Sequence, residues 1–245
     1  MSISRLYNPD AKADILIVCE HASNYIPTVY DNLGLDSEVL NLHVAWDIGA
    51  LELAKRLSDK LESRLLYATV SRLVYDLNRP PQSADAMPEQ SEIFQIPGNK
   101  NLTDEEKQVR VKACYKPFHK ALAKELEEAR TLITIHSFTP VYKGQKRQTD
   151  IGILHDADDR LADQMLKQAE VCKDYIIKRN EPYSVEDGVT HTLAKHAIPK
   201  GKPNVMIEVR NDLIVSQEGQ DKICTMLCGW LESALAKLLA EEVNS

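Results

Sequence analysis

The strongest constraint on the fold is a short apolar run that ends in ionisable side chains. Residues 15–19 read Ile-Leu-Ile-Val-Cys and are followed at once by Glu20 and His21. A run of this length, bounded by charge, is typical of a strand that is buried on both faces, as in a parallel sheet. In open α/β sheets, ligands bind beyond the carboxyl ends of the strands. The run therefore predicts a buried strand with a binding site at its end.

Two later segments repeat this pattern. Residues 131–135 are apolar apart from two threonines and deliver His136, and residues 205–207 deliver Glu208. A single histidine at a strand end is usually a hydrogen-bonded structural residue. The recurrence carries more weight, because polar side chains at the ends of buried strands must find partners or take part in chemistry. Two imidazoles and a carboxylate at one sheet edge indicate a metal-dependent hydrolase site.

The composition excludes several other classes of protein. Of the 245 residues, 43% are hydrophobic and 27% are charged, and no repeat or flexible linker divides them, so we expect one domain over residues 1–245. The net charge of −7 argues against a nucleic-acid partner, and no apolar run reaches the roughly 20 residues of a membrane span. Five dispersed cysteines indicate reduced thiols and a cytoplasmic protein. The sequence leaves open whether the chain forms homo-oligomers.

Helical patterns separate the apolar runs through most of the chain. They cover residues 39–61, 104–126, 161–172, 187–197 and 216–239. The second of these follows a capping box in which Thr103 is paired with Glu106. His119 falls outside the apolar row of that helix and is interpreted as a surface residue. The alternation of strands and helices predicts a three-layer α/β/α fold with a mixed, mostly parallel central sheet.

Further candidate ligands lie between these elements. His43 and Asp47 are four residues apart, a spacing that puts both on one face if the segment is helical. Asp47 is explained equally well as the N-cap of a helix that begins at Ile48. His155, after a short apolar run at residues 151–154, is the main rival for a ligand role.

Arg79 and the segment after it suggest how a substrate is held. The proline at position 80 disfavours a helical conformation at Arg79, whose guanidinium fork suits a carboxylate. A surface ion pair between Arg79 and Asp76, of little energetic value, is the alternative. Residues 80–101 contain four prolines and lack periodicity, which is typical of a lid. His191, near the start of its helix, is a further candidate for the pocket.

These residues together fit the requirements of a zinc hydrolase, which holds its metal with three protein ligands and leaves a position open. His21, His136 and either Asp47 or Glu20 could supply the ligands, and Glu208 the base that accepts a proton from water. On the substrate side, Arg79 and Arg210 could anchor a carboxylate or stabilise an oxyanion, with Ser137 beside them.

Five stretches of the chain resemble the N-formylglutamate amidohydrolase family. They are Cys-Glu-His-Ala-Ser-Asn (19–24), His-Val-Ala-Trp-Asp-Ile-Gly-Ala (43–50), Asp-Leu-Asn-Arg (76–79), Ile-His-Ser-Phe (135–138) and Ile-Glu-Val-Arg (207–210). The resemblance runs from about residue 14 to the C-terminal helix. It implies an enzyme with one Zn²⁺ per chain that releases formate from an N-formyl amino acid. It also implies the phosphorylase/hydrolase-like fold of zinc carboxypeptidases.

The more distant similarity to carboxypeptidases implies roles for single residues. His136 matches the last zinc histidine, and Glu208 matches the general base. Asn78 and Arg79 are similar to the pair that grips the terminal carboxylate of the substrate. N-formylglutamate carries two carboxylates, so Arg79 together with Arg210 or Arg72 would form the anchors, although another anionic N-acyl amino acid is an alternative substrate.

The chain departs from these families in two places. Carboxypeptidases have a glutamate three residues after the first zinc histidine, where this chain has Asn24, so Asp47 is the preferred third ligand and Glu20 the reserve. Formylglutamate enzymes follow that histidine with Ser-Gly, whereas this chain has Ala-Ser-Asn. The fold and the metal chemistry are therefore better supported than the substrate.

Two other functions compete with this interpretation. Cys19 and His21 lie two residues apart on a strand, share a face and could form a thiol-dependent amidohydrolase, although a buried small hydrophobe explains Cys19 as well. A catalytically inactive module that binds an amino-acid-like ligand is the other alternative.

Overall fold

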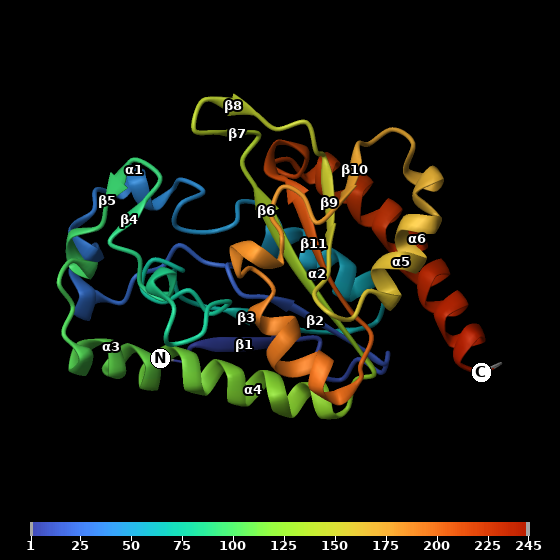
Figure 1. Ribbon diagram of the computed structural model, residues 1–245, viewed down its shortest axis with the longest axis horizontal. Coiled ribbons are helices and arrows are strands. Elements are labelled where there is room, and N and C mark those ends of the chain that lie inside the picture. Colours follow the sequence, from blue (N-terminus) through green and yellow to red (C-terminus); the bar gives the residue numbers. More distant parts are fainter. Residues whose placement is uncertain (1, 244–245) are drawn as a thin grey trace.

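A mixed, mostly parallel sheet forms the centre of the molecule. In the computed structural model, which describes residues 2–243, this sheet has seven strands (Figure 1). From edge to edge they are β1 (Ser4–Tyr7), β3 (Arg64–Ala68), β2 (Ile15–Cys19), β6 (Thr131–Phe138), β11 (Asn204–Arg210), β9 (Ile151–Leu154) and β10 (Ile177–Arg179). The strands β3, β2, β6 and β11 run parallel to one another. The strand β1 is antiparallel to β3, and β9 is antiparallel to β11 but parallel to β10, so the predicted mixed sheet is confirmed.

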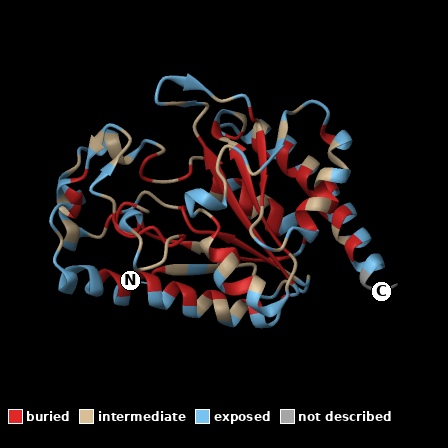
Figure 2. Cartoon of the chain, viewed as in Figure 1, coloured by how far each residue is buried: buried red, intermediate tan, exposed pale blue. Residues whose placement is uncertain are grey.

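Helices cover both faces of the sheet, as the three-layer prediction requires. On one face lie α2 (Ala50–Lys60), α5 (Arg160–Lys167) and α6 (Gln217–Val243); on the other lie α3 (Asp104–Arg110), η4 (Val111–Tyr115), α4 (Lys116–Glu127) and η7 (Leu193–Ala197). The alternation of side chains along β2 explains the two cores. Ile17 and Cys19 pack with α2 and α6, while Leu16 and Val18 pack with α4. Figure 2 shows the strands buried between the two helical layers.

The remaining elements lie in the loops, mostly around the carboxyl ends of the central strands; η8 instead precedes the amino end of β11. They are η1 (Thr28–Gly34), α1 (Ser37–Leu40), η2 (Ala84–Ala86), β4 (Gln90–Ser91), β5 (Phe94–Gln95), η3 (Pro97–Asn99), β7 (Val141–Tyr142), β8 (Gln145–Lys146), η5 (Ala169–Cys172), η6 (Val185–Asp187), η8 (Ile198–Lys200) and η9 (Asn211–Leu213). The hairpins β4–β5 and β7–β8 project from the main body (Figure 1). The first of them lies inside the segment predicted as a lid.

Two predictions about the helices need correction. The helix expected over residues 39–61 begins only at Ala50, because Gly49 adopts a left-handed φ of 80°. A Cβ atom on Gly49 would lie 2.5 Å from the carbonyl oxygen of Ile214, so the close approach of η9 requires a glycine there. His119, expected on the surface, is 5% exposed and lies on the face of α4 that packs against η7. Its nitrogen Nδ1 is 2.7 Å from Nε2 of His196.

Other predicted helices are confirmed in outline. Thr103 caps α3 through the predicted box, since its hydroxyl accepts from the backbone of Glu106 at 3.2 Å. Residues 217–241 of α6 are long and apolar enough to cross a membrane, a test that the core helix of a globular protein also passes. Here Ile223 and Leu231 are buried against the sheet, and Trp230 donates to the carbonyl of Met165 at 2.7 Å. The helix α6 is therefore part of the core.

Candidate metal centre and substrate pocket

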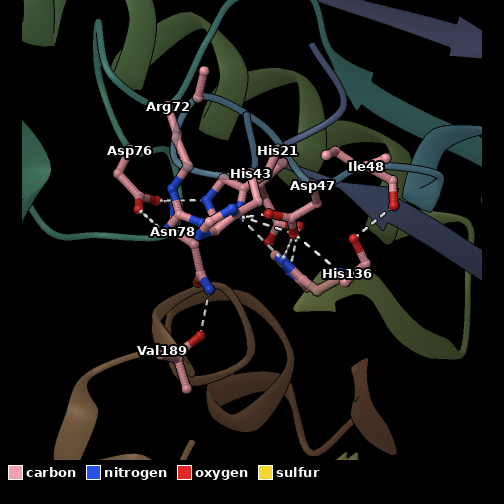
Figure 3. Close-up of polar contacts among 12 residues, drawn as sticks. His21, His43, Asp47, Ile48, Arg72, Asp76, Asn78, His136 and Val189 are labelled. Atoms are coloured by element: carbon pink, nitrogen blue, oxygen red, sulfur yellow. Dashed lines mark hydrogen bonds and ion pairs between the residues drawn. The ribbon is translucent and has the colours of Figure 1, made fainter. Parts of the chain in front are cut away.

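Three side chains from distant segments converge at the carboxyl ends of the central strands. His21 follows β2, His136 lies in the adjacent parallel strand β6, and Asp47 lies in the turn before α2 (Figure 3). Oδ2 of Asp47 is 3.3 Å from Nδ1 of His21 and 2.9 Å from Nδ1 of His136. One ligand atom from each residue lies within 4.8 Å of the others, and all three residues are buried. Two histidines and an aspartate in this arrangement could hold a metal ion.

Two more carboxylates lie beside the imidazoles, and the one from Asp76 is hydrogen-bonded to its ring. Asp76 lies 2.8 Å from Nε2 of His21, and Glu20 lies 3.1 Å from Nε2 of His136. A carboxylate at Nε2 favours the tautomer with its proton there, which leaves the lone pair of Nδ1 free for a metal. Burial opposes protonation of both rings, yet the surrounding carboxylates raise the pKa of His21 and of His136. The arrangement puts Asp47 at the ligand atoms and Glu20 behind His136.

The position of Asp47 differs from that of a helix cap. The helix α2 begins three residues later, and its N-terminus has no side-chain cap. The carboxylate instead faces the two histidines and accepts from the backbone nitrogen of Ser137 at 3.3 Å. Although burial opposes it, contact with the imidazoles holds the pKa of Asp47 far below its usual range. The ligand interpretation of Asp47 therefore fits this structure, and the cap interpretation does not.

Arg72 links the acids of this centre. Its Nη2 lies 2.8 Å from Asp76, and its Nη1 lies 3.4 Å from Asp47. The sequence predicted Arg72 only as a substrate anchor and assigned Asp76 no role beyond a possible surface pair with Arg79. Both are instead positioning residues around His21, and no local pattern marks them, because the histidine they support is about 50 residues away in the chain.

Glu208 stands beside the three candidate ligands. It lies on β11 directly opposite His136 on β6 and is 4% exposed. Its Oε2 atom is buried and makes no hydrogen bond within the described part of the chain. Burial and the charge of Asp47 raise the pKa of Glu208 to about 7 although His136 opposes the rise. A buried carboxyl with a pKa near neutrality is suited to exchanging protons.

A cavity of 360 Å³ opens in front of these residues and includes both hairpins in its wall. Asn78 and Arg79 line it, as expected. The amide of Asn78 donates to the carbonyl of Val189 (Figure 3). It also accepts from the backbone nitrogen of Thr192 at 2.9 Å. These two contacts fix the turn that presents Arg79. Ser137 also lines the cavity, and its hydroxyl donates to the carbonyl of Ile48 at 2.8 Å.

The structure does not bring Arg210 into the cavity wall. Arg210 follows Glu208 by two residues on the same strand, β11. The guanidinium is instead bound by two carboxylates outside the pocket, Asp150 at 2.5 Å and Asp212 at 2.8 Å. Arg210 therefore has no contact from which a catalytic role could be argued.

His191 also lies behind the cavity wall. Its Nε2 is 2.9 Å from the hydroxyl of Tyr115, and its ring packs against His119. Burial and the nearby Lys195 lower the pKa of His191 to about 4. The residue supports the segment that contacts Asn78 and does not face the pocket.

Two other histidines considered as ligands lie apart from the cluster. His43 pairs with Glu92, in the turn between β4 and β5, at 2.8 Å. His155, the main rival, contacts the carbonyl of Asp156 and the guanidinium of Arg179. Neither belongs to the group of side chains that could hold a metal.

The thiol of Cys19 is not placed for nucleophilic chemistry. Its side chain is completely buried and packs in the core between the sheet and α2. Burial, together with the charges of Asp47 and Glu20, raises the pKa of the thiol well above its ordinary value. A reactive cysteine needs the opposite environment, one that stabilises the thiolate.

The fold and the site together define a hydrolase with a candidate metal centre. The family model for N-formylglutamate amidohydrolase matches residues 13–215, and the chain belongs to this family, as its resemblance implied. A crystal structure of a gene product from Agrobacterium tumefaciens is 49% identical, covers 97% of this chain and 96% of that one, and superposes with a TM-score of 0.95.

A more distant relative carries the family's activity in its name. The N-formylglutamate amidohydrolase from Ralstonia eutropha JMP134 is 17% identical, with all of both chains covered and a TM-score of 0.64. At this identity the likeness shows that the two proteins share a fold. A search of curated protein sequences found no match.

Proposed function

We propose that this protein is a zinc-dependent amidohydrolase that cleaves the formamide bond of N-formyl-L-glutamate or a related N-acyl amino acid. The products are formate and the free amino acid. The observation that carries the proposal is the convergence of two Nδ1 atoms and one carboxylate oxygen next to the unpaired carboxyl of Glu208. Membership of the N-formylglutamate amidohydrolase family supports the same reaction class.

The donor set suits Zn²⁺, with one ion per chain. His21, Asp47 and His136 would hold it, since imidazole and carboxylate are its usual ligands in hydrolases. The two Nδ1 atoms are 3.2 Å apart, a distance at which both could bind the same ion once neither carries a proton. When bound, the ion would polarise the amide carbonyl and lower the pKa of water.

The residues of this chain would then move the protons of the reaction. Glu208 accepts a proton from the water that attacks the formyl carbon. As the C–N bond breaks, the same carboxyl gives that proton to the leaving nitrogen, which departs as an amine. A pKa near 7 allows one carboxyl to serve first as base and then as acid.

The substrate carboxylate would be held by Arg79. Its guanidinium lines the cavity, and its Nε and Nη1 atoms have no hydrogen-bond partner among residues 2–243. Asn78 supports this turn through its contacts with the segment that contains Val189 and Thr192. This arrangement orients the formamide relative to Glu208.

Metal analysis of the purified protein and an assay on N-formyl and N-acetyl amino acids test the proposal. We expect about one zinc per chain, loss of turnover with a chelator and its return with added Zn²⁺. Glu208→Gln is the matched variant, because it should keep the metal and lose turnover. Activity that survives metal removal but is lost with iodoacetamide would favour the cysteine enzyme. Ligand binding without turnover, unaffected by Glu208→Gln, would favour the inactive module.

A further inference from the structure

The cavity offers a single arginine with unpaired donors. Two arginines line it within the described residues, Arg72 and Arg79. Arg72 uses both terminal nitrogens on the carboxylates of Asp76 and Asp47. Arg79 leaves Nε and Nη1 without a partner among the residues that the structure describes. No carboxylate within residues 2–243 forms an ion pair with the Arg79 guanidinium, so one carboxylate of a ligand can be met there.

Two further arginines near the cavity are already held in place. Arg210 lies outside the wall and is paired with two aspartates. Arg147 lies behind the aromatic part of the wall, 4.7 Å from the ring centre of Tyr142 and 4.8 Å from that of Tyr183. It donates to the Tyr183 hydroxyl at 3.1 Å. Neither the Arg210 nor the Arg147 guanidinium is therefore available in the cavity wall to bind a second carboxylate of the substrate.

The part of the wall formed by the lid and η6 is acidic instead. Asp85, Glu92 and Asp187 line the cavity there. Glu92 is paired with His43, while Asp187 accepts from the backbone nitrogen of Ser184 at 2.8 Å. Within residues 2–243, neither Asp85 nor Asp187 forms an ion pair with a lysine or arginine. Asp85 and Asp187 are exposed, so water weakens their repulsion of a ligand carboxylate, but no lysine or arginine cancels it.

We infer that the substrate carries one carboxylate and that its side chain is neutral or cationic. This inference rests on the proposed amidohydrolase function and narrows its substrate class. The single carboxylate binds Arg79, and the side chain extends toward Asp85, Glu92 and Asp187. N-formylglutamate, with its second carboxylate, is then a poorer substrate than an N-formyl amino acid of the same shape without that charge.

N-formyl-L-glutamine and N-formyl-L-glutamate form the decisive pair, because they have the same shape and differ by one charge. We expect kcat/KM for the glutamine compound to be at least tenfold higher in the zinc-loaded enzyme. Equal values, or a preference for glutamate, would overturn the inference. If neither compound is hydrolysed, the proposed function fails separately. In that case, calorimetry measures the affinity of the Glu208→Gln variant for each compound. Tighter binding of N-formyl-L-glutamine supports the inference. Equal affinities, tighter binding of N-formyl-L-glutamate or no detectable binding would overturn it.

The acidic wall itself is tested with Asp85→Asn/Asp187→Asn. Asparagine keeps an oxygen that can accept from Ser184, so the turn at η6 retains its hydrogen bond. We expect the ratio of kcat/KM for N-formyl-L-glutamine to kcat/KM for N-formyl-L-glutamate to fall at least threefold in the double variant. Glu186→Gln, an exposed neighbour that does not line the cavity, is the matched control and should leave the ratio unchanged. An unchanged ratio in the double variant, or an equal change in the control, would overturn the assignment to this wall.

Discussion

The Nδ1 atoms of His21 and His136 lie 3.2 Å apart, although 115 residues separate the two histidines in the chain. They meet because β2 and β6 are adjacent parallel strands that end at the same edge of the sheet. Asp47 reaches the same point from the turn before α2. When neither Nδ1 carries a proton, two imidazole nitrogens and a carboxylate at these distances could bind one cation, and this relationship underlies the proposed chemistry.

Replacing His136 with alanine should remove both metal and activity. The change deletes one of three ligands, and we expect zinc content to fall by about tenfold or more. Metal analysis combined with circular dichroism would separate loss of zinc from loss of the fold. His43→Ala, which removes a histidine outside the cluster, should keep its zinc. Full zinc occupancy in His136→Ala would exclude the residue from the ligands.

The Glu208→Gln substitution should separate metal binding from catalysis. An amide of the same shape cannot accept the proton from water, so we expect kcat to fall by about 10² to 10⁴ while zinc content stays unchanged. Steady-state kinetics and metal analysis on the same preparation measure both. Unchanged hydrolysis in this variant would refute the assignment of Glu208 as the base.

Asp47 and Glu20 should differ in how strongly they affect the metal. Asp47→Ala removes a proposed ligand and should abolish tight zinc binding. Glu20→Gln disturbs only the carboxylate at Nε2 of His136, so we expect zinc affinity to weaken by about 10- to 100-fold. Titration against a competing chelator gives both affinities. If Glu20→Gln had the larger effect, the assignment of the third ligand would be reversed.

The buried histidines behind the pocket should make stability depend on pH. Burial and the neighbouring His196 lower the pKa of His119 to about 3, and burial and Lys195 lower that of His196 to about 4. Below the ordinary histidine pKa of about 6.5, the unfolded chain binds protons that the folded chain excludes. The free energy of unfolding should therefore decrease as the pH falls from about 6.5 toward 4.

Urea denaturation across this pH range, with wild type and His119→Gln/His196→Gln compared, measures the effect. The metal centre is common to both proteins, so the difference between them isolates the two buried imidazoles. We expect the free energy of unfolding to change less with pH in the double variant than in the wild type. Parallel pH profiles would show that the His119–His196 pair does not resist protonation.

The sequence by itself determined the features that depend on neighbouring residues. Apolar runs predicted β2, β6 and β11, because a buried strand needs hydrophobic side chains on both faces. The capping box at Thr103 was equally local. The start of helix α2 was predicted too early, because the conformation of Gly49 depends on its contact with Ile214, which lies far away in the chain.

Only the tertiary structure decided which groups meet. Whether Asp47 or Glu20 faces the Nδ1 atoms depends on the register of β2 and β6 and on the turn before α2, which no local pattern specifies. Arg210 was expected to act with Glu208 two residues away, yet it pairs with Asp150 and Asp212 outside the pocket. Hydrophobic periodicity reports which side chains are buried, whereas the partners of a buried charge come from other segments, so their identity appears only when the chain is folded.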